Sequence, residues 1–218
     1  MPLTRYGLRE WMLAAVIAAA IAVPAGLVGL WWLVGVAAVL FLAVAWFFRD
    51  PPFRRPADPD PRAMVSPADG KVTAVFVDPS HPGAEGGPAL VIRIFLSVLD
   101  VHVNRAPAGC TVTALHHAPG KYLDARTEES ARVNESNLVR LRLDDGLPIA
   151  VRQVSGAIAR RIVCPLAVGD RLERGQRFGM IKFGSTTELI IGRPDDHEPA
   201  VREGDRVVGG VTILARPR

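Results

Sequence analysis

An uncharged, apolar stretch runs from Trp11 to Phe48, and it limits the folds open to this chain more than any other feature. As a single helix, rising about 1.5 Å per residue, it would be nearly twice as long as the ~30 Å hydrocarbon core of a bilayer is thick. Pro24 and two glycines lie near its middle, where such residues break or bend a helix. The stretch therefore predicts two short helices, over residues 11–27 and 30–48, folded as a hairpin.

Basic residues flank the apolar stretch on both sides. Arg5 and Arg9 precede it, and Arg49, Arg54 and Arg55 follow it. This arrangement favours a membrane-attached protein with both ends of the hairpin, and the domain that follows, on the cytoplasmic side. A secretory signal peptide is disfavoured because the stretch is too long and ends in no clear Ala-x-Ala site. Spanning the bilayer and shallow insertion both remain open.

Charge and composition exclude other classes of partner. The net charge of +4 suits the anionic headgroups of a membrane surface. The arginines are scattered, aromatic residues make up only 6%, and no recognition motif is present, so we expect no nucleic-acid partner. Cys110 and Cys164 lack the spacing of metal ligands and would be reduced in the cytoplasm, so we expect neither a metal site nor a disulfide.

The remaining chain divides into a linker and a β domain. Residues 49–62 contain five prolines and alternating charges, which predicts a stiff linker along the membrane surface. Residues 63–218 carry short apolar runs separated by Gly and Asp turns, which predicts a mainly β sandwich or partly closed barrel. A Gly-Asp-Arg turn occurs at 169–171 and again at 204–206, as in lipoyl-like carrier sandwiches. Residues 65–77 are expected to be a strand entry with a turn at Asp69–Gly70. The other expected strands are 89–98, 109–117, 137–143, 147–154, 178–183, 187–192 and 207–215.

A Gly184–Ser185 step lies between two of these strand-like runs and has the composition of a self-cleavage site. Glycine has no Cβ, so its carbonyl is open to attack by the next side chain. Attack by the Ser185 hydroxyl would replace the amide with an ester, and β-elimination would leave dehydroalanine, which hydrolyses to a pyruvoyl group. That ketone forms Schiff bases with amines and accepts electrons. A plain turn between strands is the alternative.

Polar segments interrupt the β pattern where side chains could converge. Asp69 lies in a turn ahead of a strand, and residues 100–107 bring Asp, His102, Asn104 and Arg105 together after the most apolar strand. His116 and His117 would face opposite sides of one strand, so at most one points into a site. The loop histidines His81 and His197 are expected to be solvated.

With these segments in view, the chain from about residue 47 to the C-terminus resembles phosphatidylserine decarboxylase, in its short bacterial and archaeal form. Six motifs, each weak alone, follow in the family's order. They are Phe-Phe-Arg-Asp-Pro at 47–51, Pro-Ala-Asp-Gly at 67–70, Asp-Val-His-Val-Asn-Arg-Ala-Pro at 100–107, Pro-Gly-Lys at 119–121, Asn-Glu at 134–135 and Phe-Gly-Ser at 183–185.

The resemblance implies a proenzyme that cleaves itself between Gly184 and Ser185. A β chain of residues 1–184 and an α chain of residues 185–218 would result, with Ser185 converted to the covalent pyruvoyl cofactor. Phosphatidylserine would be decarboxylated to phosphatidylethanolamine. His102 matches the histidine that helps to bind or protonate the substrate, and Asp69 matches the aspartate of the cleavage machinery. The substrate-binding candidates are Asn104, Arg105 and His117.

Three positions depart from the family pattern. The long bacterial form has a second histidine as the cleavage base, where this chain has Arg105. His102, His116 and His117 are therefore all candidate bases, as is Asp69 acting through water. Thr186 and Ser136 also differ from many short-form relatives.

Physical reasoning and the resemblance lead to the same reaction class. Decarboxylation of an amino acid needs an electron sink, and no pyridoxal-binding pattern or Schiff-base lysine is evident. The alternatives are decarboxylation of another serine-headed lipid, decarboxylation of a soluble amino acid, and a membrane-tethered β-sandwich adaptor without enzymatic activity. A homodimer is a reasonable expectation.

Overall fold

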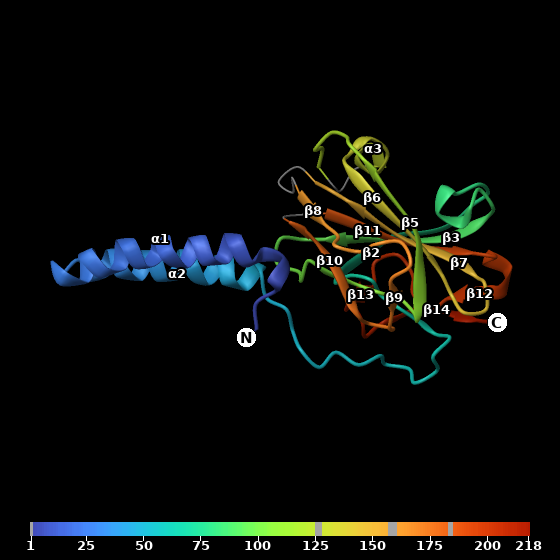
Figure 1. The fold of residues 1–218 in the computed structure, drawn as a ribbon, viewed down its shortest axis with the longest axis horizontal. Coiled ribbons are helices and arrows are strands. Elements are labelled where there is room, and N and C mark those ends of the chain that lie inside the picture. Colours follow the sequence, from blue (N-terminus) through green and yellow to red (C-terminus); the bar gives the residue numbers. More distant parts are fainter. Residues whose placement is uncertain (1, 125–127, 157–160, 183–184) are drawn as a thin grey trace. The chain divides into compact units, whose positions relative to one another are not determined.

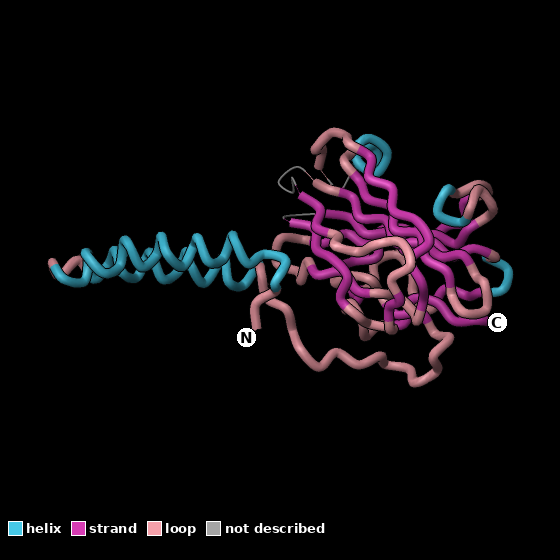
Figure 2. Tube along the Cα trace, in the orientation of Figure 1, coloured by secondary structure: helices cyan, strands magenta, loops and turns pink. Residues whose placement is uncertain are grey.

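The computed structural model describes residues 2–124, 128–156, 161–182 and 185–218. The chain divides into two compact units, a helix unit (Met1–Pro52) and a β unit (Phe53–Arg218). Figures 1 and 2 show the helices and the strands of the two units. The boundary falls inside the predicted linker 49–62, so residues 53–62 belong to the β unit.

The helix unit is a hairpin of two apolar helices. A single 3₁₀ turn (η1, Arg5–Gly7) leads into α1 (Leu8–Leu27), and α2 (Trp31–Phe47) packs beside it. The turn between the helices contains Gly29 at a φ of 79°, a conformation that favours glycine. The ends are joined by a hydrogen bond from the Thr4 amide to the Phe48 carbonyl (2.8 Å). The predicted helical hairpin is thus present.

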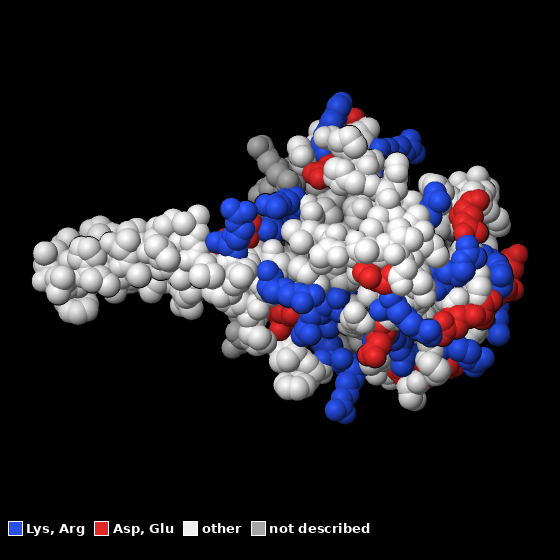
Figure 3. Space-filling model, viewed as in Figure 1, with Lys and Arg blue, Asp and Glu red and all other residues white. Residues whose placement is uncertain are grey.

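Most side chains of the two helices are exposed and apolar, and Figure 3 draws this unit white along most of its length. Of the described residues, Arg5–Leu27 is long and apolar enough to cross a membrane, while Trp31–Phe47 is apolar but shorter.

The β unit confirms the prediction of a mainly β fold. Its large sheet has the order β13-β2-β3-β11-β7-β6-β5-β9, with antiparallel neighbours, and two three-stranded sheets have the orders β4-β10-β8 and β1-β14-β12. The strands are β1 Met64–Val65, β2 Gly70–Asp78, β3 Ala89–Leu96, β4 Val103–Arg105, β5 Cys110–Ala118, β6 Ser136–Arg142, β7 Pro148–Val154, β8 Arg161–Val163, β9 Arg171–Leu172, β10 Arg177–Lys182, β11 Ser185–Gly192, β12 His197–Pro199, β13 Arg206–Val207 and β14 Ile213–Pro217. The short helices are η2 Pro82–Ala84, α3 Glu128–Val133 and η3 Pro194–Asp196.

The strand order explains the Gly-Asp-Arg turn that occurs twice in the sequence. The Gly204 amide donates to the Val72 carbonyl on β2 (2.9 Å), and the Gly169 amide donates to the Val112 carbonyl on β5 (2.8 Å). Each turn therefore caps the penultimate strand at one edge of the large sheet. The two edges are built alike, and β11 and β7 lie at the centre.

The core explains why the central strands are apolar along their whole length. All eight residues of β11 are buried. One face of β11 packs Leu189 and Ile191 into the main core, and the other packs Ile190 against Ala84 of η2 and its neighbours. Burying each large aliphatic side chain contributes roughly 1.5–3 kcal/mol. The strand that begins with Ser185 is therefore held on both faces.

Three local expectations differ from the structure. The run 207–215 is not one strand, because a turn at Gly209–Gly210 divides it into β13 and β14. His81 and His197, expected to be solvated, are both buried. The Nδ1 atom of His81 accepts a hydrogen bond from the Gly83 amide (2.9 Å) and so caps η2, a role that loop composition does not predict.

The first residues of the β unit form a strap over it, which we define as residues 53–63. The guanidinium of Arg174 donates to the backbone carbonyls of Asp58, Asp60 and Ala63. The Ala57 amide donates to the Val211 carbonyl (2.9 Å). Part of the predicted linker is thus bound to the β unit by backbone groups.

Candidate active site

Ser185 is the first residue of β11, and its side chain is completely buried. The expected strand at 187–192 thus begins at the serine itself. Its Oγ has no hydrogen-bond partner among the described residues. A buried hydroxyl without a partner is uncommon and points to a functional role or a ligand. Gly184, the other half of the predicted cleavage step, lies outside the described residues.

One strand pair and one backbone hydrogen bond bring the chain segments of Ser185 and His102 together. Ser185 pairs with Leu96 at the end of β3, and the chain then turns through residues 97–100 to His102. The His102 carbonyl accepts a hydrogen bond from the Ile181 amide on β10 (3.2 Å), four residues before Ser185. The strand register therefore brings the serine and the histidine into one region.

The contact of His102 with its own loop identifies its basic nitrogen. The ring is completely buried, and Nδ1 lies 2.9 Å from the backbone carbonyl of Asp100. A carbonyl oxygen can only accept a hydrogen bond, so Nδ1 carries the proton in this contact. In the neutral ring the other nitrogen, Nε2, is then the proton acceptor.

Asp69 is bound by Arg54 of the strap. Both terminal nitrogens of the Arg54 guanidinium donate to the two carboxylate oxygens, one of them at 2.9 Å, and the Gly209 amide donates to Oδ1 (2.9 Å). Next to it, Gly70 has a φ of 151°, and an added Cβ would lie 2.2 Å from the Phe95 carbonyl oxygen. Asp69 is thus fixed where β2 closely approaches the end of β3.

Asn104 belongs to a buried chain of amide and hydroxyl groups. Its Nδ2 donates to Thr187 Oγ1 (3.1 Å), and its Oδ1 accepts from Gln153 Nε2 (2.8 Å). Gln153 Oε1 in turn accepts from Asn137 Nδ2 (2.9 Å). All four side chains are buried. The chain runs across the core-facing side of the large sheet and ends two residues from Ser185.

A second buried serine lies beside Ser185. Thr186 pairs with Val154, the last residue of β7, so Ser185 and Ser155 are each the chain neighbour of one member of this pair. Ser155 is completely buried, and its Oγ also lacks a partner among the described residues. Two unpartnered hydroxyls therefore occupy the same end of the sheet.

The Pro-Gly-Lys and Asn-Glu motifs hold the backbone of Ser155. Asn134 Nδ2 donates to the Ser155 carbonyl (2.8 Å), and the Ser155 amide donates to the Glu135 carbonyl (2.9 Å). The Lys121 backbone makes hydrogen bonds with the backbone of residues 133 and 135 (2.7 and 3.0 Å). An added Cβ on Gly120 would lie 2.4 Å from the Val133 carbonyl oxygen. The close approach at residue 120 requires a glycine, and the hydrogen bonds orient Ser155.

The other predicted site residues lie apart from this group. Arg105 pairs with Arg177 at the opposite end of β10 and donates to the Gly175 carbonyl (3.1 Å). His117 is exposed on β5, three strands from β11, and its Nε2 lies 2.8 Å from Glu135 Oε1. His116, on the same strand, is also exposed.

The two cysteines behave as buried residues. Burial raises the pKa of Cys110 to about 12 and raises the pKa of the partly buried Cys164. Over the described ranges, no group of three His, Cys, Asp or Glu side chains is arranged to hold a metal ion.

A comparison with known sequences now decides the family. The profile described as phosphatidylserine decarboxylase matches residues 40–215, most of the chain. The chain belongs to the phosphatidylserine decarboxylase family. Three curated relatives carry the name phosphatidylserine decarboxylase proenzyme. The one from Symbiobacterium thermophilum is 49% identical over 186 residues, covering 85% of this chain and 84% of the relative. Those from Rhodopirellula baltica and Carboxydothermus hydrogenoformans are 43% and 40% identical, each over 99% of this chain and 88% or 97% of the relative.

Three residues that sequence reasoning missed surround the predicted site of this phosphatidylserine decarboxylase family member. They are Arg54, Gln153 and Ser155. Arg54 was assigned to the basic flank, and the other two lie in an ordinary β run. Pairing of strands distant in the sequence brings them to the site, so no local pattern could have identified them.

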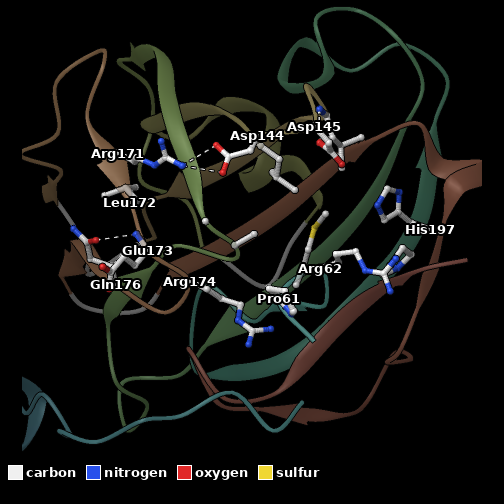
Figure 4. A pocket seen from close by; sticks show the side chains of 16 residues that line it. Pro61, Arg62, Asp144, Asp145, Arg171, Leu172, Glu173, Arg174, Gln176 and His197 are labelled. Carbon is white, nitrogen blue, oxygen red and sulfur yellow. Dashed lines mark hydrogen bonds and ion pairs between the residues drawn. The ribbon is translucent and has the colours of Figure 1, made fainter. Parts of the chain in front are cut away.

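A cavity of about 780 Å³ lies elsewhere. Figure 4 shows Arg174 and His197 on its wall and Arg171 paired with Asp144. It also contacts Leu147, which precedes β7 and lies near the C-terminal end of β11. Seven residues of strand separate that end from Ser185, which amounts to about 20 Å. The cavity therefore does not mark the candidate active site.

Proposed function

We propose that this chain is a self-cleaving proenzyme that decarboxylates phosphatidylserine to phosphatidylethanolamine with a pyruvoyl group made from Ser185. One observation carries the proposal: the first residue of a fully buried strand is a serine whose hydroxyl has no hydrogen-bond partner among the described residues, in the same region as a buried histidine. The relatives are named as proenzymes, which supports a processed form.

The cleavage step uses the chain's own groups. Ser185 Oγ attacks the carbonyl carbon of Gly184. The amide nitrogen of Ser185 leaves as a free amine, which gives an ester. Loss of the Cα proton and rupture of the Cβ–Oγ bond release residues 1–184 with a terminal carboxylate. The dehydroalanine left at residue 185 takes up one water and loses ammonia, which completes the pyruvoyl group. His102 Nε2 is the proposed base because Nδ1 is engaged as a donor.

Ser155 supplies a hydrogen bond to this reaction. Ser155 follows Val154, the partner of Thr186, and its hydroxyl has no hydrogen-bond partner among the described residues, so it could donate to an oxygen that gains negative charge during attack. Asp69 acts on the site from its fixed position beside β3, with Arg54 as its positioning residue. These roles rest on register and burial.

The pyruvoyl ketone would supply the electron sink for loss of CO₂ from an amine-bearing substrate. The buried serine at the start of β11 suits such a group because conversion removes a hydroxyl that makes no hydrogen bond to a described residue. Asn104 is the best placed of the substrate-binding candidates, since its amide reaches Thr187 beside Ser185. A substrate-binding role for Arg105 or His117 stays a prediction.

The helix unit would anchor the enzyme to the membrane that contains its substrate. Arg5, Arg9 and Arg49 flank the apolar helices, which favours a β unit on the cytoplasmic side. A cysteine at Gly29, in the turn between the helices, tests this topology. A membrane-impermeant thiol reagent added outside intact cells would label it if the hairpin spans the bilayer, and would fail to label it if insertion is shallow.

Intact-protein mass spectrometry of the full chain beside its Ser185→Ala variant tests the proposed function. We expect two chains from the wild type, with the 185–218 chain about 17 Da lighter than the serine-initiated peptide because one NH₃ is lost. The variant stays at 23.5 kDa. An uncut wild type would favour the adaptor, and cleavage followed by activity on free serine alone would favour the soluble-substrate alternative.

A further inference from the structure

The turn between β3 and β4 presents two apolar side chains to water. Val98 is 45% exposed and Leu99 is 73% exposed. The turn has a defined conformation, since Asp100 Oδ2 accepts from both the Ser97 amide (2.8 Å) and the Ser97 hydroxyl (2.7 Å). The Asp100 amide donates back to the Ser97 carbonyl (2.9 Å). The fold therefore holds the two apolar groups outward on a rigid support.

This turn lies beside the candidate active site. Leu96, which precedes it, pairs with Ser185, and His102 follows it by two residues. Asp100 connects the two regions, because its carboxylate fixes the turn while its carbonyl accepts from His102 Nδ1. Whatever binds Leu99 is therefore adjacent to the reacting residues.

Two exposed cations lie at the same end of the sheet. Arg206 is 73% exposed and donates to Asp100 Oδ1 (3.2 Å). Lys71 pairs with Arg206 on one side and with Phe95 on the other, and it makes no ion pair with the described residues. An apolar tip flanked by basic residues is the composition of surfaces that bind anionic membranes.

The chain also enters the β unit at this end. Phe53 is 94% exposed, and its neighbour Arg54 is bound to Asp69, next to the point where β2 meets Phe95. The apolar helices precede Phe53 in the sequence. Phe53 is thus a third exposed apolar side chain at this end of the β unit.

We infer that the 97–100 turn is a lipid-docking element of the β unit. Val98 and Leu99 enter the acyl region of the leaflet, and Lys71 and Arg206 contact anionic headgroups. Ser185 and His102 then lie at headgroup depth, where the bond to be broken in a serine headgroup is found. The inference rests on the proposed function, because it brings the active site to the membrane that contains the lipid substrate.

The protein offers a matched control at the other end of the sheet. Val168 is 64% exposed in a turn of the same construction, in which Asp170 Oδ2 accepts from the Ala167 amide (2.8 Å). The turn that contains Val168 caps β5 at Val112. Successive cross-strand pairs lead from Val112 through Ile149 to Ile191, which is six residues from Ser185 along β11. If the membrane contacts the β unit at the active site, Val168 should stay in water.

The test places a fluorescent NBD label on Leu99→Cys or on Val168→Cys in the full chain. Both are made in a Cys164→Ser background, and Cys110 stays unreactive because burial raises its pKa to about 12. The proteins are reconstituted in phosphatidylcholine and phosphatidylglycerol vesicles whose acyl chains carry bromine, a contact quencher. We expect quenching at least about threefold greater at position 99, because a buried leucine site is in contact with hydrocarbon. Equal quenching at the two positions would overturn the inference and favour a protein partner.

A second experiment uses the double variant Val98→Ser/Leu99→Ser with Val168→Ser as control. We expect decarboxylation of phosphatidylserine in vesicles to fall about fivefold while turnover of dispersed short-chain phosphatidylserine is kept, since only apolar contact with the bilayer is removed. Equal loss on both substrates, or no loss on either, would refute docking. The quenching of the NBD label can be measured whether or not the chain cleaves itself. An uncut wild type would therefore overturn the proposed function and leave the docking result to stand.

Discussion

Arg54 donates from both ends of its guanidinium group to the two carboxylate oxygens of Asp69, and one of the same nitrogens donates to the Gly209 carbonyl (2.9 Å). Both side chains are largely buried. A paired geometry of this kind fixes the direction of a carboxylate as well as its charge. The strap thus positions a residue of the candidate active site from fifteen positions earlier in the chain.

Arg54→Gln should destabilise the β unit by about 2–4 kcal/mol, because it leaves a largely buried carboxylate without its cation. Formation of the 185–218 chain should also slow. The neighbouring exposed residue gives the control, Arg55→Gln, which should change neither. Denaturant unfolding in the uncleaved Ser185→Ala background measures stability, and gel analysis of fresh protein measures cleavage. Equal behaviour of the two variants would show that the Arg54 pair has no special role.

Gln153→Leu should destabilise the protein by about 2–4 kcal/mol. The substitution removes the Gln153 partner of both Asn104 Oδ1 and Asn137 Nδ2 in the buried core, at about 1–3 kcal/mol each. Adding Asn137→Leu should recover part of the loss, since it removes one of the two unpaired groups. Strictly additive effects in this double-mutant cycle, measured by denaturant unfolding, would argue against a coupled chain of hydrogen bonds.

Ser155→Ala should slow self-cleavage at least about tenfold, the lower range for loss of a donor to a developing oxyanion. Stability should change by less than about 1 kcal/mol, because the hydroxyl makes no hydrogen bond to a described residue. Time-resolved mass spectrometry after cell-free synthesis gives the rate. Ser136→Ala is the control, as its hydroxyl contacts Arg152 at 3.4 Å. Cleavage of Ser155→Ala at the wild-type rate would exclude the proposed donor.

Acidification should destabilise the fold through His81. Burial lowers the pKa of His81 below its usual value, opposed by the nearby carboxylates of Glu188 and Asp78, while Arg152 lowers it further. The folded state therefore holds the neutral ring, and its stabilising contribution is present above about pH 6.5 and lost as the pH falls toward the folded-state pKa.

His81→Asn should reduce this pH dependence, because an amide oxygen can accept from the Gly83 amide but does not titrate. The free energy of unfolding at pH 7.5 and pH 5.5 in the Ser185→Ala background tests it. The exposed His116 supplies the control variant, His116→Asn, which should keep the wild-type slope. If His81→Asn has the same slope as the wild type, another group causes the acid sensitivity.

The local sequence pattern predicted secondary structure correctly where one physical effect dominates. The apolar helices follow from hydrophobic length and from Gly29, which lies in the turn between them, and β6 and β7 begin and end within one residue of the expected runs. The 207–215 run was misjudged because its three valines, Ile213 and Leu214 outweigh Gly209–Gly210, although that pair makes a turn with Gly210 at a φ of 76°. His81 was misjudged because loop composition does not reveal that its ring caps η2.

The sequence by itself determined the apolar hairpin, the β character of residues 63–218 and the Gly-Ser step with its accompanying polar motifs. These depend on hydrophobic periodicity and on residue chemistry, which act over a few neighbouring positions. Only the tertiary structure decided that Ser155 and Ser185 lie at the same end of the sheet, that Gln153 connects Asn137 to Asn104, and that Arg54 holds Asp69. Such contacts depend on the register between strands distant in the chain, and a shift of one residue would turn every side chain to the other face.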